Sequence, residues 1–294
     1  MSDEARGRPA GATAPEIAAA YARLKACLAD MGSVVVAFSG GVDSSLLLAA
    51  AQDALGKRAL AVTACSPTYP AHEKEQAVTL ARLIGARHEL VDSREMDDPA
   101  FRANPPDRCY HCKRELFREL HAIAAREGAA VIVDGSNDDD RADFRPGSGA
   151  AREAGVRSPL AELGIGKDMV RAMARERGLP NWEQPACACL ASRIPYGQEI
   201  TPARLSRLSE VEADIRGLGF RTVRVRDHDD LARIEVGRDE IPRALAEETR
   251  LRLAEACKRR GFTYVCLDLE GYRTGSMNEI LAREVQAQGP HADA

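Results

Sequence analysis

The stretch VVVAFSGGVDSSLLLAAAQDAL (34–55) decides the fold. Its first part, VVVAF (34–38), is a short run rich in β-branched residues, which is typical of a buried strand. Its last part, DSSLLLAAAQDAL (43–55), is rich in helix-forming residues. The glycine-containing segment SGGVDSS (39–45) joins the two. A strand, a glycine turn and a helix in this order predict the opening unit of an α/β fold.

The same alternation continues along the chain. Further buried strands are predicted at 59–65, 88–92 and 129–135, with helices at 72–85, 107–127 and 166–180. This spacing indicates a doubly wound parallel sheet. The later pattern differs, with a helix at 201–220, a hairpin at 221–227 and 231–236, a helix at 240–260 and a strand at 262–270. We therefore expect a lead-in (1–14), an α/β domain (15–185), a smaller α+β domain (186–285) and a tail (286–294).

The composition is that of an ordinary soluble protein. The 294 residues are 45% hydrophobic and 29% charged, and the net charge of −4 argues against a protein that mainly grips nucleic acid. No apolar run approaches the ~20 residues that span a bilayer, and the N-terminus lacks the order of a secretory signal. We expect a cytoplasmic protein without a membrane partner, in which the eight cysteines are mostly thiols or ligands.

The segment 39–45 has the composition of a phosphate-binding loop. Gly40 and Gly41 allow a tight turn and close approach of the backbone, and the following helix start offers free N–H groups. Hydroxyl donors come from Ser39, Ser44 and Ser45. Asp43 repels a phosphate unless Mg²⁺ lies between them. The segment matches neither the Walker pattern nor the dinucleotide pattern GxGxxG.

The hairpin of the second domain places arginines on one face. Alternation directs Val223 and Val225 to one side, and Arg224 and Arg226 to the other, where Arg233 and Glu235 join them. That side is either a solvated face with surface ion pairs or a binding site for a phosphate or carboxylate group. The last strand places Cys266 on its polar side.

Between the two predicted domains lies QPACACLASRIPYG (184–197), in which Cys187 and Cys189 are separated by one residue. In an extended strand the two thiols would diverge, and only a turn brings them together. They are packing residues, metal ligands or a reacting thiol. Arg193 beside them can stabilise a thiolate, and Ser192 can donate a hydrogen bond.

The loop SGGVDSS resembles the PP-loop of the ATP pyrophosphatase superfamily, whose members cleave ATP between the α and β phosphates. Further stretches make the chain similar to the LarE family: RCYHCK (108–113), DFRPG (143–147), RSPL (157–160), CLASRIPYG (189–197), RVR (224–226), ARIEV (232–236) and DLEGYRTGSMNE (268–279). The resemblance implies an ATP- and Mg²⁺-dependent sulfur transferase of nickel-pincer nucleotide synthesis, and a homo-oligomer. Such an enzyme adenylates a carboxylate of pyridinium-3,5-dicarboxylate mononucleotide and converts it to a thiocarboxylate.

The resemblance also implies residue roles. Cys189 is the attacking thiol, the end of the second strand near Thr63 borders the nucleotide, and the loop holds the pyrophosphate. Arg193 is a candidate for stabilising the thiolate and the substrate phosphate. Three further arginines are candidates for binding the substrate phosphate and the spare carboxylate: Arg224, Arg226 and Arg273. Glu212 and Glu235, with Asp43, are the implied magnesium or acid–base residues.

The source of the sulfur stays open between two mechanisms. A sacrificial cysteine leaves a dehydroalanine in the protein, whereas three thiolates, from Cys187, Cys189 and Cys266, can hold a [4Fe–4S] cluster that carries an extra sulfide. Cys109 and Cys112 are further ligands, a redox pair or structural residues. The competing functions are a tRNA thiolase, an amide-forming synthetase and an ATP-binding regulator without chemistry.

Overall fold

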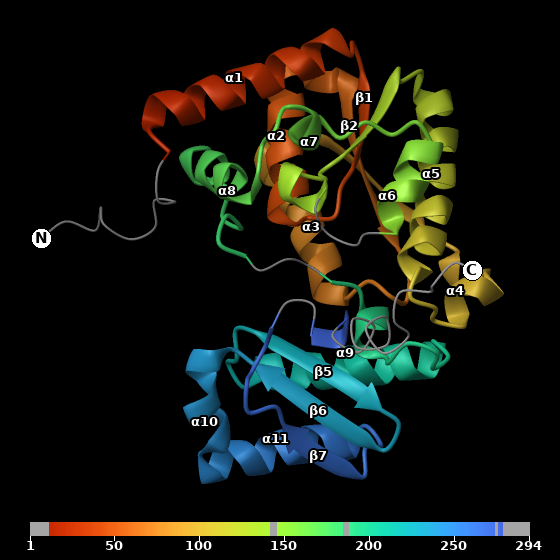
Figure 1. The fold of residues 1–294 in the computed structure, drawn as a ribbon, viewed down its shortest axis with the longest axis vertical. Coiled ribbons are helices and arrows are strands. Elements are labelled where there is room, and N and C mark those ends of the chain that lie inside the picture. The colour runs from red at the N-terminus through yellow and green to blue at the C-terminus, as the bar shows by residue number, and fades with distance from the viewer. Residues whose placement is uncertain (1–11, 142–145, 185–187, 274–275, 279–294) are drawn as a thin grey trace, which may run out of the picture. The chain divides into compact units, whose positions relative to one another are not determined.

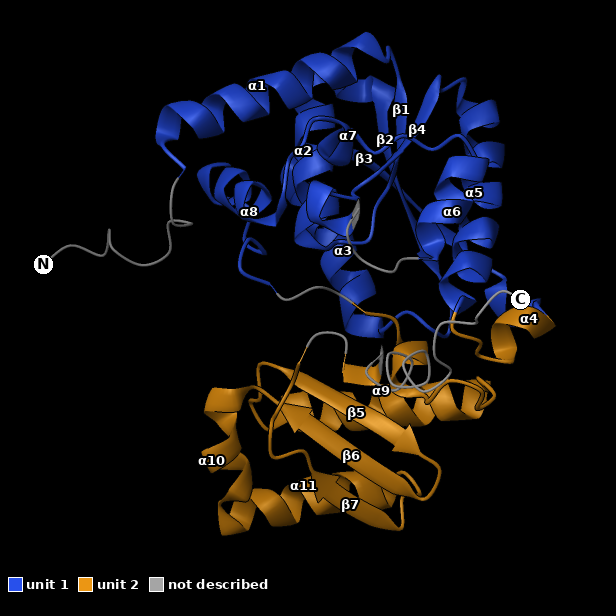
Figure 2. Ribbon diagram, in the orientation of Figure 1, with its two compact units in different colours: residues 1–98, 107–187 blue, residues 99–106, 188–294 orange. Residues whose placement is uncertain are grey.

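The computed structural model describes residues 12–141, 146–184, 188–273 and 276–278. The chain divides into two compact units, one of Met1–Asp98 and Asp107–Cys187, the other of Pro99–Pro106 and Ala188–Ala294 (Figure 2). The segment 99–106 contains α4 (Pro99–Arg102) and joins the second unit. There the backbone nitrogen of Ile200 donates to the carbonyl of Arg102 at 2.8 Å. Nothing in the sequence pattern of this segment indicates that assignment.

The first unit is built on a four-stranded parallel sheet in the order β3-β2-β1-β4. Its strands are β1 (Val34–Ala37), β2 (Ala59–Cys65), β3 (Arg87–Asp92) and β4 (Val131–Asp134). This confirms the predicted α/β fold class. The chain order reverses between β1 and β4, and doubly wound sheets bind ligands beyond the carboxyl ends of the strands at such a point. The segment 39–45 follows β1, so the fold places it at this position.

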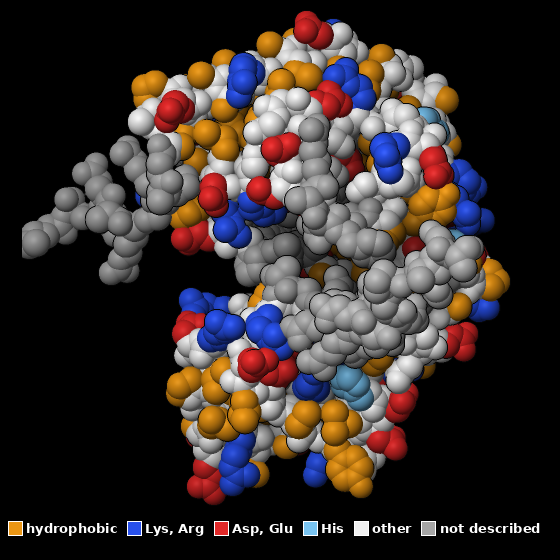
Figure 3. Space-filling model, in the orientation of Figure 1, with side chains coloured by type: hydrophobic (Ala, Val, Ile, Leu, Met, Phe, Trp, Pro, Cys, Tyr) orange, Lys and Arg blue, Asp and Glu red, His pale blue; other side chains and the backbone are white. Residues whose placement is uncertain are grey.

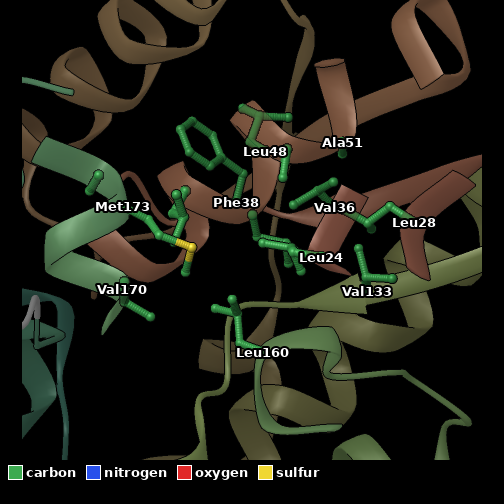
Figure 4. Close-up of a cluster of buried hydrophobic side chains, with 14 of the residues drawn as sticks. Leu24, Leu28, Val36, Phe38, Leu48, Ala51, Val133, Leu160, Val170 and Met173 are labelled. Atoms are coloured by element: carbon green, nitrogen blue, oxygen red, sulfur yellow. The ribbon is translucent and has the colours of Figure 1, made fainter. Parts of the chain in front are cut away.

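Helices cover both faces of this sheet (Figure 1). One layer packs against Val34 and Val36 of β1, and the other packs against Val35. The first layer comprises α1 (Ala14–Asp30), α2 (Val42–Leu55), α3 (Ala71–Ile84), α7 (Pro159–Glu162) and α8 (Lys167–Glu176), and the second α5 (Arg108–Glu127) and α6 (Gly147–Glu153). Figure 4 shows Leu24, Leu28 and Leu48 of α1 and α2 converging on Val36 in the first layer. This core fixes the strand end from which the glycine loop leaves.

The second unit has a three-stranded sheet in the order β5-β6-β7. β5 (Val223–His228) and β6 (Leu231–Val236) form the predicted hairpin, whose turn uses Asp229 at φ +60°, and β7 (Tyr264–Leu267) runs parallel to β6. The helices are α9 (Pro202–Gly217), α10 (Ile241–Leu245) and α11 (Glu247–Arg259). The Thr201 hydroxyl caps α9 by accepting from the Arg204 nitrogen at 3.3 Å.

Two predicted elements of this unit have different bounds in the structure. The helix expected at 240–260 is interrupted at Ala246, whose extended backbone (ψ 137°) ends α10 and starts α11. The strand expected at 262–270 pairs with β6 only over Tyr264–Leu267, opposite Leu231–Ile234, although β6 itself continues to Val236. Both differences follow from local backbone geometry that apolar periodicity does not record.

Acidic and basic side chains are interspersed on the surface that Figure 3 shows. Within the described residues, no helix combines the length and apolar character needed to cross a membrane.

Candidate active site

The glycine loop is held in shape by residues from other elements of the first unit. Gly40 has φ +70°, and a Cβ there would lie 3.2 Å from Ala77, so this position requires glycine. The Asn181 amide donates to the carbonyl of Gly40 at 2.9 Å, and the Tyr69 hydroxyl donates to the carbonyl of Ser39 at 2.7 Å. These two hydrogen bonds from residues outside the loop stabilise its conformation.

The three predicted serines have different positions. Ser39 is exposed, and its hydroxyl oxygen lies 3.1 Å from that of Ser44. Ser44 is 5% exposed and donates to the carbonyl of Gly41 at 3.1 Å. Ser45 is fully buried and accepts from the Asn181 amide at 3.0 Å. Ser39 thus lines the open side of the loop, whereas Ser45 supports it from within.

A further glycine supports the loop from the neighbouring strand. Gly135 follows β4, and a Cβ built on it would lie 2.8 Å from the backbone nitrogen of Ser44 and 3.0 Å from its Cα. Backbone atoms cannot swing aside as a flexible side chain can. The first turn of α2 therefore keeps its place only because residue 135 has no side chain.

We expect Gly135→Ala to displace the first turn of α2 and to raise the KM for ATP about tenfold, with a stability loss of about 1–3 kcal/mol from overpacking. The control is Gly149→Ala in α6, where the nearest atom to a new Cβ is 3.8 Å away. That change is expected to leave KM unchanged and to stabilise the helix by about 0.5–1 kcal/mol. Urea unfolding measures the change in stability, and ATP saturation curves measure the change in KM. Equal values in Gly135→Ala and Gly149→Ala would contradict the close contact between residue 135 and the backbone of Ser44.

A lysine far away in sequence approaches the loop. Lys167, at the start of α8, forms an ion pair with the carboxylate of Asp43. The same carboxylate accepts from the Asn137 amide at 3.1 Å. The Lys167 backbone nitrogen donates to the Asp139 carboxylate at 2.6 Å, which anchors the start of the helix. The fold thus supplies beside the loop the cation that the loop sequence lacks.

Sequence reasoning missed Lys167, Asn137 and Asn181. The one available signal was Gly166 followed by a lysine at a helix start, which is a common surface pattern.

Thr63 lies behind the loop and not on its open side. It is 1% exposed, and its hydroxyl donates to the carbonyl of Phe38 at 2.7 Å. Its oxygen lies 2.9 Å from Nε2 of His88, which therefore donates, since the hydroxyl proton is already committed. The His88 ring also meets Phe38 edge-on, at 5.6 Å between centroids. Thr63 and His88 together hold the end of β1 from which the loop starts.

Burial lowers the pKa of His88 below its ordinary value of 6.5. The unfolded chain then binds more protons than the folded chain as pH falls through 6.5, so this residue's contribution to stability decreases in acid. We expect His88→Gln to lose less stability than the parent between about pH 7 and pH 5.5. Urea unfolding at both pH values measures this, with His121→Gln as the control, and an unchanged pH dependence in His88→Gln would contradict it.

In the second unit, Cys189 begins a tight turn. The 3-10 helix Leu190–Arg193 follows it, and the Ser192 nitrogen and hydroxyl donate to the Cys189 carbonyl at 3.0 and 2.8 Å. The Cys189 residue is partly exposed. Cys187 lies outside the described residues. Arg193 is fully buried and does not present its guanidinium to solvent.

Most of the arginine face of the hairpin is buried in the unit, unlike the solvated face that was one expectation, and only Arg233 among its three arginines keeps as much as 30% of its side chain exposed. Arg224 is 8% exposed and Arg226 is 5% exposed. Arg226 forms a two-bond ion pair with Glu235, at 3.0 and 2.6 Å, and Arg224 stacks over Tyr272 with its guanidinium carbon 5.2 Å from the ring centroid. Arg273 pairs with Glu270 at 2.7 Å.

The two glutamates predicted to bind metal or exchange protons are engaged by arginines. Glu212 and Glu235 are both fully buried. Burial raises the pKa of Glu212, but Arg193 and Arg216 outweigh that effect and lower the pKa to about 2. A carboxylate with so low a pKa is a weak base. Glu212 therefore fits an anchoring role better than the predicted one. Glu235 is held by Arg226 with two hydrogen bonds.

The remaining cysteines are dispersed. Cys109 and Cys112 lie near the start of α5 in the first unit, and Cys266 lies on β7 in the second, where burial raises the pKa of its thiol. Over the described part of the chain, no three Cys, His, Asp or Glu side chains gather as a metal site.

Comparisons with known proteins agree with this architecture. Residues 18–118 match the family model described as NAD synthase. A protein of Lactiplantibacillus plantarum named pyridinium-3,5-bisthiocarboxylic acid mononucleotide synthase is 40% identical over 268 residues, which cover 91% of this chain and 96% of that protein. An uncharacterized protein of Synechocystis sp. is 44% identical over 88% of this chain and 97% of its own length. The argininosuccinate synthase of Natronomonas pharaonis is 26% identical over 52% of this chain.

Proposed function

The chain belongs to the LarE family of PP-loop enzymes, the family of pyridinium-3,5-bisthiocarboxylic acid mononucleotide synthase, and on this premise we propose that it is an ATP-dependent sulfur transferase acting on a pyridinium dicarboxylate mononucleotide. The observation that carries the proposal is the Cys189 turn, in which a partly exposed cysteine lies on a backbone held by two buried arginines. ATP activates the carboxylate, and the thiol displaces AMP from it.

The first unit has the role of adenylation. A carboxylate oxygen of the substrate attacks the α-phosphate of ATP, and pyrophosphate leaves. The exposed Ser39 and the N-terminus of α2 are suited to the departing pyrophosphate. Mg²⁺ commonly binds one or two carboxylates together with substrate phosphates, and Asp43 beside the loop fits that requirement. Lys167 then exchanges Asp43 for a phosphate oxygen, so its charge offsets the charge of the leaving group.

The second unit has the role of supplying sulfur. The Cys189 thiolate attacks the activated acyl carbon, AMP leaves, and a thioester joins the substrate to Sγ. Removal of the Cα proton then breaks the Cβ–Sγ bond. The substrate leaves as a thiocarboxylate, and residue 189 becomes dehydroalanine. The sequence is redox-neutral, and one protein molecule supplies one sulfur atom.

A cluster-bound sulfide is the alternative sulfur source. Of the three cysteines predicted as cluster ligands, Cys187 lies outside the described residues, and Cys189 and Cys266 are not part of any three-ligand group among the described ones. We propose Cys189 itself as the donor, because Arg193 holds its backbone carbonyl and a single thiol is enough to attack the activated carboxylate.

Substrate-dependent pyrophosphate release tests the function. With Mg·ATP, we expect AMP and pyrophosphate in equal amounts only when the pyridinium dicarboxylate mononucleotide is present. Nicotinic acid mononucleotide, which has one carboxylate fewer, is a matched control for the second carboxyl group. Equal release with tRNA in place of the nucleotide would favour a thiolase, and ATP binding without any pyrophosphate release would favour a regulator.

A further inference from the structure

Arg193 is a fully buried arginine four residues after the proposed nucleophile. Charged side chains are almost never fully buried unless they are paired. Its partner is Glu212 of α9, also fully buried, which it meets with two parallel bonds at 2.9 and 3.1 Å. A buried ion pair is weak support for stability, because desolvation offsets the attraction. Net stability therefore does not explain why Arg193 and Glu212 are paired in the interior of the unit.

The NH1 group of Arg193 is directed at one short turn. Its NH1 group donates to the carbonyl of Cys189 at 2.8 Å, to the carbonyl of Ala188, and to the Ser192 hydroxyl at 3.1 Å. Ser192 in turn donates to the same Cys189 carbonyl from its nitrogen and its hydroxyl. That carbonyl oxygen thus lies at the centre of three donors.

A second arginine holds the same turn from another strand. Arg226 of β5 donates from NH1 to the carbonyl of Ser192 at 3.1 Å, while its other donors bind Glu235. Both arginines thus bind a buried carboxylate on one side and a backbone carbonyl of the turn on the other. The described bonds of Arg193 go to the backbone, to the Ser192 hydroxyl and to Glu212.

We infer that Arg193, held by Glu212, is a positioning residue that fixes the peptide planes around Cys189 and so sets the direction of its thiol. This inference deepens the proposed function and rests on it. The carbonyl and Cβ of Cys189 share one Cα, so immobilising the carbonyl limits where Sγ can lie. A misplaced nucleophile slows group transfer without weakening substrate binding. The sequence-based expectation differed, because it directed Arg193 at the thiolate and the substrate phosphate.

The planar fork of arginine is what the arrangement requires. A lysine carries its charge at one point and cannot bind a carboxylate with two bonds while also reaching two carbonyls. We therefore expect Arg193→Lys to behave like Arg193→Ala in the transfer step, although both variants are expected to adenylate substrate. Glutamine at position 212 keeps the shape but removes the charge that holds the guanidinium, so Glu212→Gln is expected to give a milder form of the same defect.

The test separates adenylation from transfer in rapid-quench experiments with Arg193→Ala, Arg193→Lys and Glu212→Gln. We expect the pyrophosphate burst and the half-saturating concentration of the mononucleotide to stay within about twofold of the parent, and thioester formation to fall about 100-fold in the Arg193 variants. Added methylguanidinium is expected to restore part of the rate in Arg193→Ala only. The matched control is Arg207→Ala, which removes another arginine of the unit that pairs with a buried aspartate, Asp227, at 2.6 Å.

A second measurement does not depend on the proposed function. The rate at which iodoacetamide alkylates Cys189, followed by peptide mass, is expected to change at least about threefold in both Arg193 variants and not in Arg207→Ala. Unchanged alkylation together with unchanged transfer would overturn the inference, and so would a parallel loss of adenylation and transfer. If the parent protein forms no thioester, the proposed donation of sulfur by Cys189 fails, while the alkylation rates still decide whether Arg193 positions Cys189.

Discussion

Replacing Cys189 by alanine is expected to abolish thiocarboxylate formation, with a loss of more than about 10³-fold in rate, because the alanine side chain offers no nucleophile to the adenylated carboxylate. Adenylation needs no thiol, so the variant is expected to release one burst of pyrophosphate, of about one equivalent per site, and then to stall. Quenched-flow assays of pyrophosphate and product measure both steps. Cys189→Ser is expected to be almost as slow, since a hydroxyl is a much weaker nucleophile near neutral pH.

The control for Cys189→Ala is Cys27→Ala, which changes a partly exposed cysteine of α1 in the first unit. It is expected to transfer sulfur at the parental rate. Thiocarboxylate formation by Cys189→Ala at a rate near that of Cys27→Ala would exclude Cys189 as the nucleophile.

Replacing Lys167 by methionine is expected to have the second-largest effect. If its ammonium group offsets charge on the departing pyrophosphate, its removal slows ATP cleavage about 10²–10³-fold. Binding of ATP is expected to weaken less than the rate falls, because the negative charge on the leaving group grows in the transition state. Single-turnover release of pyrophosphate, together with ATP titration, separates these two effects.

Lys57→Met provides the comparison for Lys167→Met. Lys57 is exposed and precedes β2, at the opposite end of the sheet from the glycine loop. Its replacement is expected to leave ATP cleavage unchanged. Similar rates in the two methionine variants would show that the ion pair between Lys167 and Asp43 is only structural.

The elements of the fold could be predicted because their signals are local. β-branched runs, helix formers and glycine positions lie next to one another in the chain, so the strand, loop and helix at 34–55 are each visible in a short window. Contacts between distant residues have no such signal. The ion pair of Asp43 with Lys167 joins positions 124 residues apart, and it depends on how α8 packs beside α2.

The surroundings of the charged side chains in the second unit were harder to predict. Alternation along β5 separates Val223 and Val225 from Arg224 and Arg226, but it does not say what covers the polar side. In the structure that side is buried, and its charges are directed at glutamates, an aromatic ring and a backbone turn. The position of Arg193 beside the cysteines does not predict its contacts either. Its guanidinium pairs with Glu212, which lies 19 residues further along the chain.

The most direct test of sulfur transfer by Cys189 is the mass of the intact protein and of its product after a single turnover with Mg·ATP and the pyridinium dicarboxylate mononucleotide. Donation of sulfur by the protein predicts that the product gains about 16 Da, as sulfur replaces oxygen, and that the protein loses about 34 Da at Cys189, the mass of H₂S. A product that gains sulfur while the protein keeps its mass would contradict donation by Cys189. AMP formation without any sulfur in the product would contradict the proposed function itself.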